Sequence, residues 1–267
     1  MSIETYHVER FEDGLVIFGD SASPELHRFI VGEVGRVGLI IADPPYGNTV
    51  DCSWDKTDLS DEEFSSWMIK WTRSWTETCL LPGAAFCVWG GIGKPGFRPF
   101  MRYLCEVEQT KTFELANLIT WKKKRGYGTK TNYLFTREEC AYFVKGLAKK
   151  PRRFHVPYLE ELRGYPGFNK KYPALDPRYR RTNVWTDINE LMQGKDHPTQ
   201  KAQKLCEVMI EVHTDPGEYV IDPFAGAGTT AFAARKLGRK FVVIENDRAY
   251  FDEIVKKLRV EFCATVI

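Results

Sequence analysis

The stretch that decides the fold runs Val220-Ile221-Asp222-Pro223-Phe224-Ala225-Gly226-Ala227-Gly228-Thr229-Thr230. It begins with the β-branched apolar residues of a buried strand and ends where a helical pattern starts. Two glycines let the intervening backbone approach a ligand closely, and the N–H groups that open a helix can hold an anion. The stretch therefore predicts a strand, a ligand-binding loop and a helix.

The next apolar run supports a nucleotide-binding unit. Phe241–Glu245 reads as a strand whose last residue, Glu245, lies 17 residues after Gly228. An acid at about this distance can accept the hydroxyls of a ribose. The candidate cofactor residues of this unit are Asp222, Phe224, Gly226, Gly228, Thr229, Thr230 and Glu245. A nicotinamide or flavin dinucleotide would suit such a loop equally well.

Outward from this unit, short apolar runs alternate with helical patterns, which indicates a sheet covered on both faces. Strands are predicted at 15–18, 37–42, 84–89, 113–121, 140–144, 219–222 and 241–245, and helices at 61–79, 97–107, 199–213, 229–237 and 248–262. We expect one α/β domain over residues 1–267, with a doubly wound, mostly parallel sheet of seven strands.

A second motif follows the predicted strand at 37–42 and reads Asp43-Pro44-Pro45-Tyr46. Two prolines stiffen the turn and leave their carbonyl groups as acceptors. A carboxylate and a carbonyl together can accept both N–H bonds of an amino group on a base, while Tyr46 stacks on the ring. The motif predicts a site for an aromatic amine, although in isolation it could also be a strand-ending turn.

Together the two motifs resemble the DNA amino-methyltransferases of the circularly permuted β group, in which Asp-Pro-Pro-Tyr precedes Phe-x-Gly-x-Gly. His197-Pro198-Thr199-Gln200-Lys201 is similar to a further segment of that family, and Gly19-Asp20 is similar to its Gly-Asp pair. The resemblance implies a Rossmann-like fold that binds S-adenosylmethionine. It also implies that His197, Thr199 and Lys201 belong to the segment at the methionine end of the cofactor, and that Asp20 contacts its adenine.

The resemblance further implies direct transfer of a methyl group to a flipped-out base in double-stranded DNA, with Asp43, Pro44, Pro45 and Tyr46 as the catalytic motif. Adenine N6 is favoured over cytosine N4, because the cytosine enzymes usually carry serine where Asp43 stands. An RNA amino-methyltransferase, a nucleic-acid-binding module with a lapsed active site and a dinucleotide oxidoreductase remain alternatives. A cognate restriction endonuclease and a second copy of the chain are partners that the resemblance allows.

Charge is unevenly distributed along the chain. The whole sequence has a net charge of +2, yet residues 122–181 contain 17 Lys and Arg against five acids. Tyrosines and prolines interrupt this stretch, and residues 149–181 read as a basic, loop-rich insertion that we expect to touch DNA. A solvated loop is the plainer interpretation. The candidate phosphate contacts are Lys122, Lys123, Arg152, Arg153, Lys170 and Lys171.

The sequence does not favour a disulfide-bonded, metal-binding, secreted or membrane protein. The seven cysteines are scattered and include no Cys-x-x-Cys pair, which favours a reduced chain over a disulfide framework or a metal site. The N-terminus lacks the pattern of a signal peptide, and no apolar run reaches the ~20 residues of a membrane span. We expect a cytoplasmic protein without a membrane partner.

Overall fold

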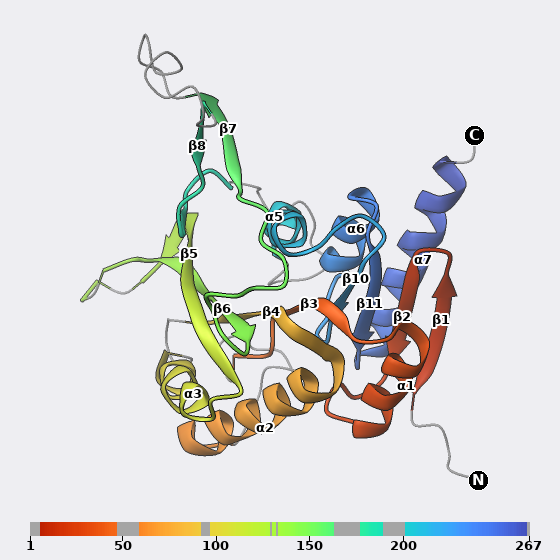
Figure 1. Cartoon of the computed structure of the whole chain (residues 1–267), viewed down its shortest axis with the longest axis horizontal. Helices are drawn as coiled ribbons and strands as arrows, with labels where there is room; N and C mark the ends of the chain where they lie inside the picture. The colour runs from red at the N-terminus through yellow and green to blue at the C-terminus, as the bar shows by residue number, and fades with distance from the viewer. Residues whose placement is uncertain are drawn as a thin grey trace.

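The computed structural model describes residues 6–46, 59–91, 97–128, 130–131, 133–162, 177–188 and 201–265. Strands in these ranges form a nine-stranded sheet in the order β1-β2-β11-β10-β3-β4-β6-β5-β9 (Figure 1). Their bounds are β1 (His7–Phe11), β2 (Gly14–Phe18), β3 (Val37–Ala42), β4 (Leu80–Gly90), β5 (Phe113–Tyr127), β6 (Phe135–Lys145), β9 (Val184–Trp185), β10 (Tyr219–Asp222) and β11 (Lys240–Glu245).

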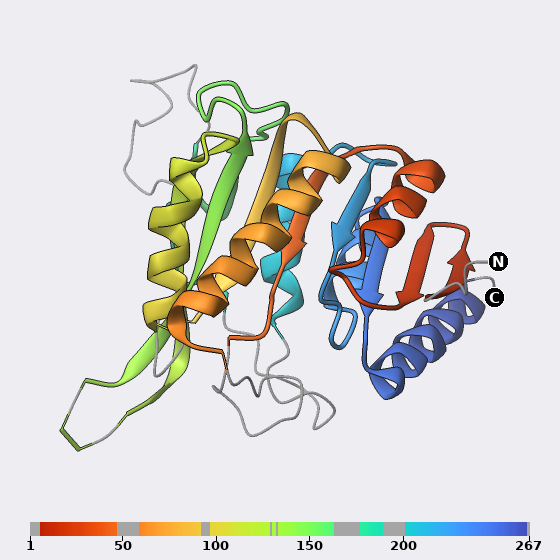
Figure 2. The same ribbon diagram turned by 90° about the horizontal axis from the view of Figure 1, so that it is seen from below.

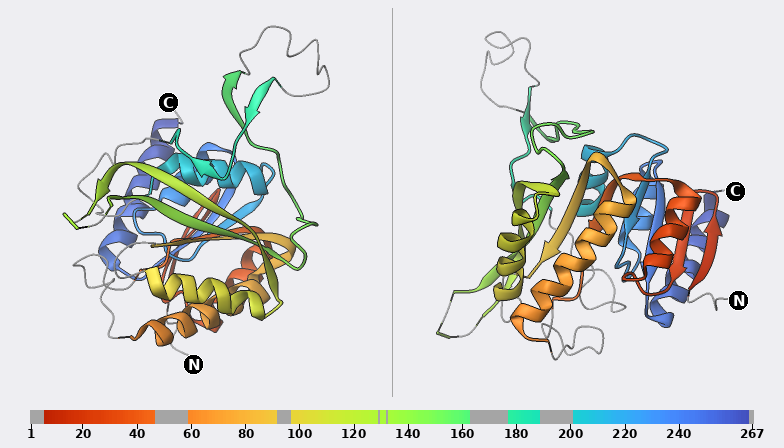
Figure 3. Two further views of the ribbon diagram at one scale, coloured as in Figure 1. Left: turned by 90° about the vertical axis from the view of Figure 1, so that its left-hand side faces the viewer. Right: turned by 60° about the horizontal axis from the view of Figure 1, so that its bottom comes forward.

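The centre of this sheet is parallel. Strands β2, β11, β10, β3 and β4 run in one direction, whereas β1 and β6 pair antiparallel to their neighbours. The α/β class and the mostly parallel sheet are thus confirmed. The sheet contains the seven predicted strands and two more: β1, which is largely exposed or half-buried, and the two-residue β9. A separate ribbon of β7 (Tyr158–Leu162) and β8 (Arg178–Arg180) stands away from the sheet (Figure 3).

Helices cover both faces of the sheet. On one face lie α1 (Pro24–Val34), α2 (Asp61–Cys79) and α3 (Phe97–Gln109), and on the other α5 (Gln203–His213), α6 (Thr229–Lys236) and α7 (Arg248–Thr265) (Figure 2). The residues of β3 alternate between these layers: Leu39 and Ile41 belong to the core under α5–α7, and Ile40 and Ala42 to the core under α1–α3. This two-sided burial explains why the strand is apolar throughout.

The helix starts show how local sequence sets the elements. Ser60 and Glu63 form a capping box at the start of α2, which buries Trp71 and Trp75 against the sheet. Helix α1 was not among the predicted helices, although Ser23 caps it and Pro24 occupies its first turn. Within the described residues, no helix is both long enough and apolar enough to span a membrane.

The parallel strands give the sheet two distinct edges. We call the edge where β3, β4, β10 and β11 end the carboxyl edge, and the edge where they begin the amino edge. The Asp43 motif follows β3 and the glycine loop follows β10, its hydrogen-bonded neighbour. Since β5 runs in the same direction as β4, the hairpin joining β5 to β6 also projects at the carboxyl edge (lime, Figure 2). Ligands of such folds bind at this edge.

Candidate active site

The Asp43 motif forms one wall of the site. The Tyr46 hydroxyl donates a hydrogen bond to Asp43 Oδ1 at 2.8 Å, which ties the two ends of the motif together. The Tyr46 ring packs on the backbone of Gly91, where an added Cβ would lie 2.8 Å from Tyr46 Cδ2. The motif lines a small pocket together with side chains of α2, β4 and α3, namely Phe64, Met68, Trp89 and Phe100. The surroundings are aromatic, as a flat base requires.

Lys201 reaches the same motif from the residues preceding α5. Its Nζ lies 2.9 Å from Asp43 Oδ1 and 2.8 Å from Asp43 Oδ2, and it donates to the Tyr46 hydroxyl at 2.9 Å. Its fourth polar contact is Glu138 Oε2, also at 2.9 Å. The sequence predicted Lys201 to hold the methionine end of the cofactor. The structure brings its ammonium group to the Asp43 motif, and a contact of Lys201 with the cofactor stays a prediction.

Glu138 contacts the candidate site but was not among the predicted site residues. It lies on β6, is largely buried, and pairs with both Lys201 and Lys123. Burial alone would raise the pKa of Glu138, but the two neighbouring cations outweigh it and lower the pKa to about 2. In the sequence, Glu138 lies just before the predicted strand at 140–144, within a strongly basic stretch.

The glycine loop is organised by buried Asp222. This carboxylate accepts the Phe224 amide at 2.9 Å and the Thr230 hydroxyl at 2.5 Å, so it joins the start of the loop to the first turn of α6. Burial raises the pKa of Asp222 to about 7, despite these hydrogen bonds. Gly228 has φ +81° and begins α6 without a side-chain cap. Its left-handed backbone is the reason that the loop needs glycine there.

Glu245 connects the loop to the neighbouring strand. Its Oε2 accepts the amide of Gly226 at 2.7 Å, and its Oε1 accepts the amides of Asn246 and Asp247 at 3.0 and 2.8 Å. Burial raises the pKa of Glu245, and these amide hydrogen bonds oppose that effect. The carboxylate is therefore held rigidly at the end of β11, where the sequence predicted a ribose acceptor.

Asp20 and Phe224 lie at the same edge and are linked through α2. Asp20 is exposed after β2, and its Oδ1 accepts the amide of Ala22 at 2.8 Å. The ring centroid of Phe224 is 4.8 Å from that of Trp71, whose Nε1 donates to Ser21 Oγ at 3.3 Å. Trp71 therefore bridges the glycine loop and the turn that carries Asp20. His197 and Thr199, also predicted here, lie outside the described residues.

The predicted DNA contacts are divided by the structure. Lys122 is exposed on β5, whereas Lys123 is half-buried and paired with Glu138. Lys170 and Lys171 lie outside the described residues. Lys122 and Lys123 precede the part of β5 that leads into the hairpin at the carboxyl edge, so they lie on the side of the site.

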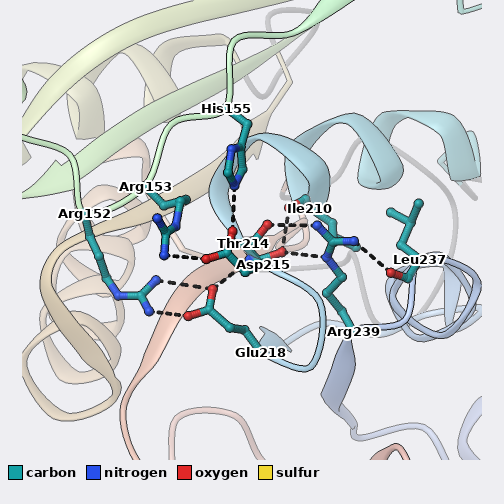
Figure 4. A network of polar contacts seen from close by, with 9 residues as sticks. All are labelled: Arg152, Arg153, His155, Ile210, Thr214, Asp215, Glu218, Leu237 and Arg239. Atoms are coloured by element: carbon teal, nitrogen blue, oxygen red, sulfur yellow. Dashed lines mark hydrogen bonds and ion pairs between the residues drawn. The ribbon is translucent and has the colours of Figure 1, made fainter.

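Arg152 and Arg153 lie elsewhere, at the amino edge. Arg152 pairs with Glu218, its backbone N–H donates to the Gly83 carbonyl at 2.7 Å, and Arg153 pairs with Asp215 (Figure 4). These contacts are with residues at the starts of β4 and β10. The two arginines thus form ion pairs within the protein, on the side of the sheet opposite Asp43. These pairs do not favour a role for them in binding DNA.

A family model described as DNA methylase matches residues 37–257. The chain belongs to the DNA methylase family. It is 30% identical over 239 residues to Type II methyltransferase M2.LlaDCHI of Lactococcus lactis subsp. cremoris, covering 82% of this chain and 81% of that protein. It is 29% identical over 242 residues to Type II methyltransferase M2.DpnII of Streptococcus pneumoniae, covering 84% and 82%.

Solved structures share this fold. A complex of M1.HpyAVI with S-adenosylmethionine superimposes with a TM-score of 0.62 at 23% identity, covering 90% of this chain and 97% of that one. The PvuII cytosine-N4-specific DNA methyltransferase gives a TM-score of 0.67 at 18% identity, covering 91% and 86%. At these identities the likeness concerns the fold alone.

The family match confirms the predicted family and, with it, the cofactor: this is an S-adenosylmethionine-dependent DNA methyltransferase. The described residues fit that cofactor. The first turn of α6 has no side-chain cap, so its amides suit a carboxylate, and the fixed Glu245 suits a ribose. Both lie at the end of the strands next to the Asp43 motif.

Proposed function

We propose that this chain methylates adenine N6 at a specific site in double-stranded DNA. The observation that carries the proposal is the adjacency of two strand ends: the acceptor motif follows β3, and the glycine loop follows β10, its direct neighbour. A base held at the first and a cofactor held at the second would meet at one edge of the sheet.

The Asp43 carboxylate and the Pro44 carbonyl would accept the two N–H bonds of the base amino group. With both hydrogens held, the nitrogen lone pair points out of the plane of the ring and can attack in line, with S-adenosylhomocysteine as the leaving group; the methylated nitrogen then releases one proton. S-adenosylmethionine, when bound, supplies an electrophilic methyl group. Tyr46 would stack on the base, and this contact offsets part of the few kcal/mol that removing a base from the duplex costs.

Adenine is preferred to cytosine because residue 43 is an aspartate. In the family that the sequence resembles, the cytosine enzymes usually have serine at this position. The preference follows this tendency of the family, since a carboxylate can accept the amino hydrogens of either base as a charge-assisted partner.

The β5–β6 hairpin is the DNA surface that we propose. Lys122 and Lys124 on β5 and Lys130 in the hairpin are exposed, and the exposed fraction of Tyr133 is 92%. The hairpin projects at the carboxyl edge, beside the pocket formed by the Asp43 motif. Exposed cations and an aromatic side chain suit phosphates and unstacked bases.

Expression in a host without DNA methylation tests the proposal, with mass spectrometry of the nucleosides and single-molecule sequencing of the DNA. We expect N6-methyldeoxyadenosine at one recognition sequence, and its absence from cells that express Asp43→Ala. N4-methyldeoxycytidine would refute the choice of base. Methylated RNA with unmodified DNA would refute the choice of nucleic acid, and bound cofactor without any product would favour a lapsed enzyme.

A further inference from the structure

We propose that Lys201 is a positioning residue for Asp43, and that Glu138, held in turn by Lys123, anchors Lys201. The inference rests on the proposed role of Asp43 as the acceptor for the base amino group. It differs from the role that the sequence predicted for Lys201, which was to bind the cofactor.

The ammonium group of Lys201 is enclosed by protein. Only 10% of the Lys201 side chain is exposed, and its Nζ lies 5.3 Å from the ring centroids of both Tyr46 and Trp89. Four polar contacts with Asp43, Tyr46 and Glu138 fall between 2.8 and 2.9 Å. A long, flexible side chain is thereby held in one place.

Positive and negative side chains alternate around Lys201. Lys123, Glu138, Lys201 and Asp43 form a row in which each charge contacts one of opposite sign. Burial by itself would lower the pKa of Lys201, but Asp43 and Glu138 outweigh burial and raise it well above its usual value. Removing one member of such a buried row leaves its neighbour without compensation.

The two carboxylate oxygens of Asp43 differ in how many hydrogen bonds they accept. Its Oδ1 receives both the Tyr46 hydroxyl, at 2.8 Å, and Lys201, at 2.9 Å, while its Oδ2 receives Lys201 at 2.8 Å. A carboxylate oxygen accepts about two hydrogen bonds. Oδ1 is therefore filled, and Oδ2 retains the capacity for one further donor. The geometry assigns Oδ2 as the atom that accepts an N–H of the base.

The contact of Lys201 with both oxygens of Asp43 has a clear effect. Lys201 fixes the plane of the carboxylate and leaves one acceptor direction open. Misplacement of a reacting group by about 1 Å can lower the rate by about 100-fold. A lysine that only bound the cofactor would change cofactor affinity instead.

The test is Lys201→Met, which preserves much of the length and removes the charge. We expect kcat for DNA methylation to fall about 10- to 100-fold, while the Kd for S-adenosylmethionine, measured by calorimetry, changes less than about twofold. The matched control is Lys204→Met, because Lys204 pairs with Glu207 on α5, away from Asp43. Its kcat should equal that of the wild type.

A pH profile separates positioning from a structural role. Without the cation, Asp43 and Glu138 approach one another as like charges, so the pKa of one carboxyl should rise. The acid limb of log kcat in Lys201→Met should therefore move to higher pH, whereas Lys201→Arg should retain the limb of the wild type. A merely structural lysine would lower thermal stability and leave the limb unchanged.

Glu138→Gln tests the anchor, and it decides the matter if Lys201→Met does not fold. We expect kcat to fall about three- to tenfold with unchanged cofactor affinity. Added to Lys201→Met, it should cause no further loss, because Glu138 acts through Lys201. Effects that multiply would overturn the anchoring role, and a Glu138→Gln enzyme with the kcat of the wild type would overturn it as well.

The role of Lys201 would be overturned if Lys201→Met had the kcat of the wild type. A particular form of this result is an unchanged kcat at saturating cofactor with the Kd for S-adenosylmethionine raised about tenfold or more, which is how a cofactor ligand behaves. Failure of the underlying role of Asp43 looks different. In that case Asp43→Asn would itself retain activity, whatever the Lys201 variants do.

Discussion

The two edges of the sheet carry similar ion pairs with different surroundings. At the carboxyl edge, Lys201 is enclosed among Asp43, Tyr46 and Glu138 next to an aromatic pocket. At the amino edge, Arg152 and Arg153 pair with Glu218 and Asp215 and fasten the segment after β6 to the starts of β4 and β10 (Figure 4). The first cluster leaves an acceptor open beside a pocket, whereas the second joins protein to protein.

Basic composition alone therefore does not locate a DNA surface. Residues 122–181 are one basic stretch in the sequence, yet β5 and β6 carry it from the carboxyl edge to the amino edge. Lys122 and Arg152 belong to the same stretch and lie on opposite sides of the sheet. Strand direction separates their roles.

The largest effect is expected from Asp43→Asn. Loss of the charged acceptor should lower kcat at least about 100-fold, or roughly 2.7 kcal/mol, with cofactor affinity unchanged. Steady-state methylation assays and calorimetry measure the two quantities. Asp215→Asn is the matched control at the amino edge and should have the kcat of the wild type. A variant with more than about a tenth of the wild-type rate would contradict the role of Asp43.

Asp222→Asn should change how stability depends on pH. The pKa of Asp222 is raised to about 7 by burial, above the ~3.9 of an unfolded chain. Its stabilising contribution is therefore fully present below about pH 4 and is lost as the pH rises through about 7. Between these limits the wild type should lose up to about 1.4 kcal/mol per pH unit relative to the variant. Urea unfolding of both proteins at several pH values checks this, and parallel curves would refute it.

Arg152→Met should weaken the fold and spare the chemistry. The guanidinium pair with Glu218 is only partly exposed, so we expect the free energy of unfolding to fall by about 1–2 kcal/mol. Chemical denaturation measures that loss, while kcat and DNA affinity should stay unchanged. Arg10→Met is the control, because its pair with Glu33 is more exposed and should contribute less to stability than the Arg152 pair. A loss of DNA affinity in Arg152→Met would return Arg152 to the DNA surface.

The smallest effect is expected from Lys122→Met. If Lys122 meets a phosphate, the slope of log K for DNA against log salt should become shallower by ~0.9. Titrations of labelled duplex at several salt concentrations give the slope. Lys150→Met belongs to the same basic stretch but is exposed near the amino edge, and it should leave the slope unchanged. Equal slopes for all three proteins would move the DNA surface away from β5.

The sequence predicts best those elements whose signals are local. The bounds of β3, β10 and α2 agree with the structure because an apolar run or a helical aromatic stripe marks each of them. Strand β1 was not predicted, since an edge strand needs no continuous apolar pattern and acquires its pairing from β2. Helix α1 did have readable signals in Ser23 and Pro24.

The sequence predicted the motifs of the candidate site, but it did not predict which residues of different motifs contact one another. Each motif contains its own chemistry, so Asp43, Tyr46, Gly228 and Glu245 could be selected from residue types and spacing. The pairing of Lys201 with Asp43 joins residues far apart in the chain. It depends on how the start of α5 packs beside β3, which no local pattern encodes. Glu138 was overlooked for the same reason.

The adjacency of β3 and β10 has a consequence for synthesis on the ribosome. The Asp43 strand β3 emerges early, but β10, the one of its two neighbours that leads into the glycine loop, is translated only at residues 219–222. Strand β2, which pairs early with β1, must likewise wait for its second neighbour β11 at residues 240–245. Such distant pairings raise the contact order and slow folding. Both halves of the active site can therefore meet only after β10 has been translated, and a chain interrupted before residue 219 contains the acceptor motif without the loop that faces it.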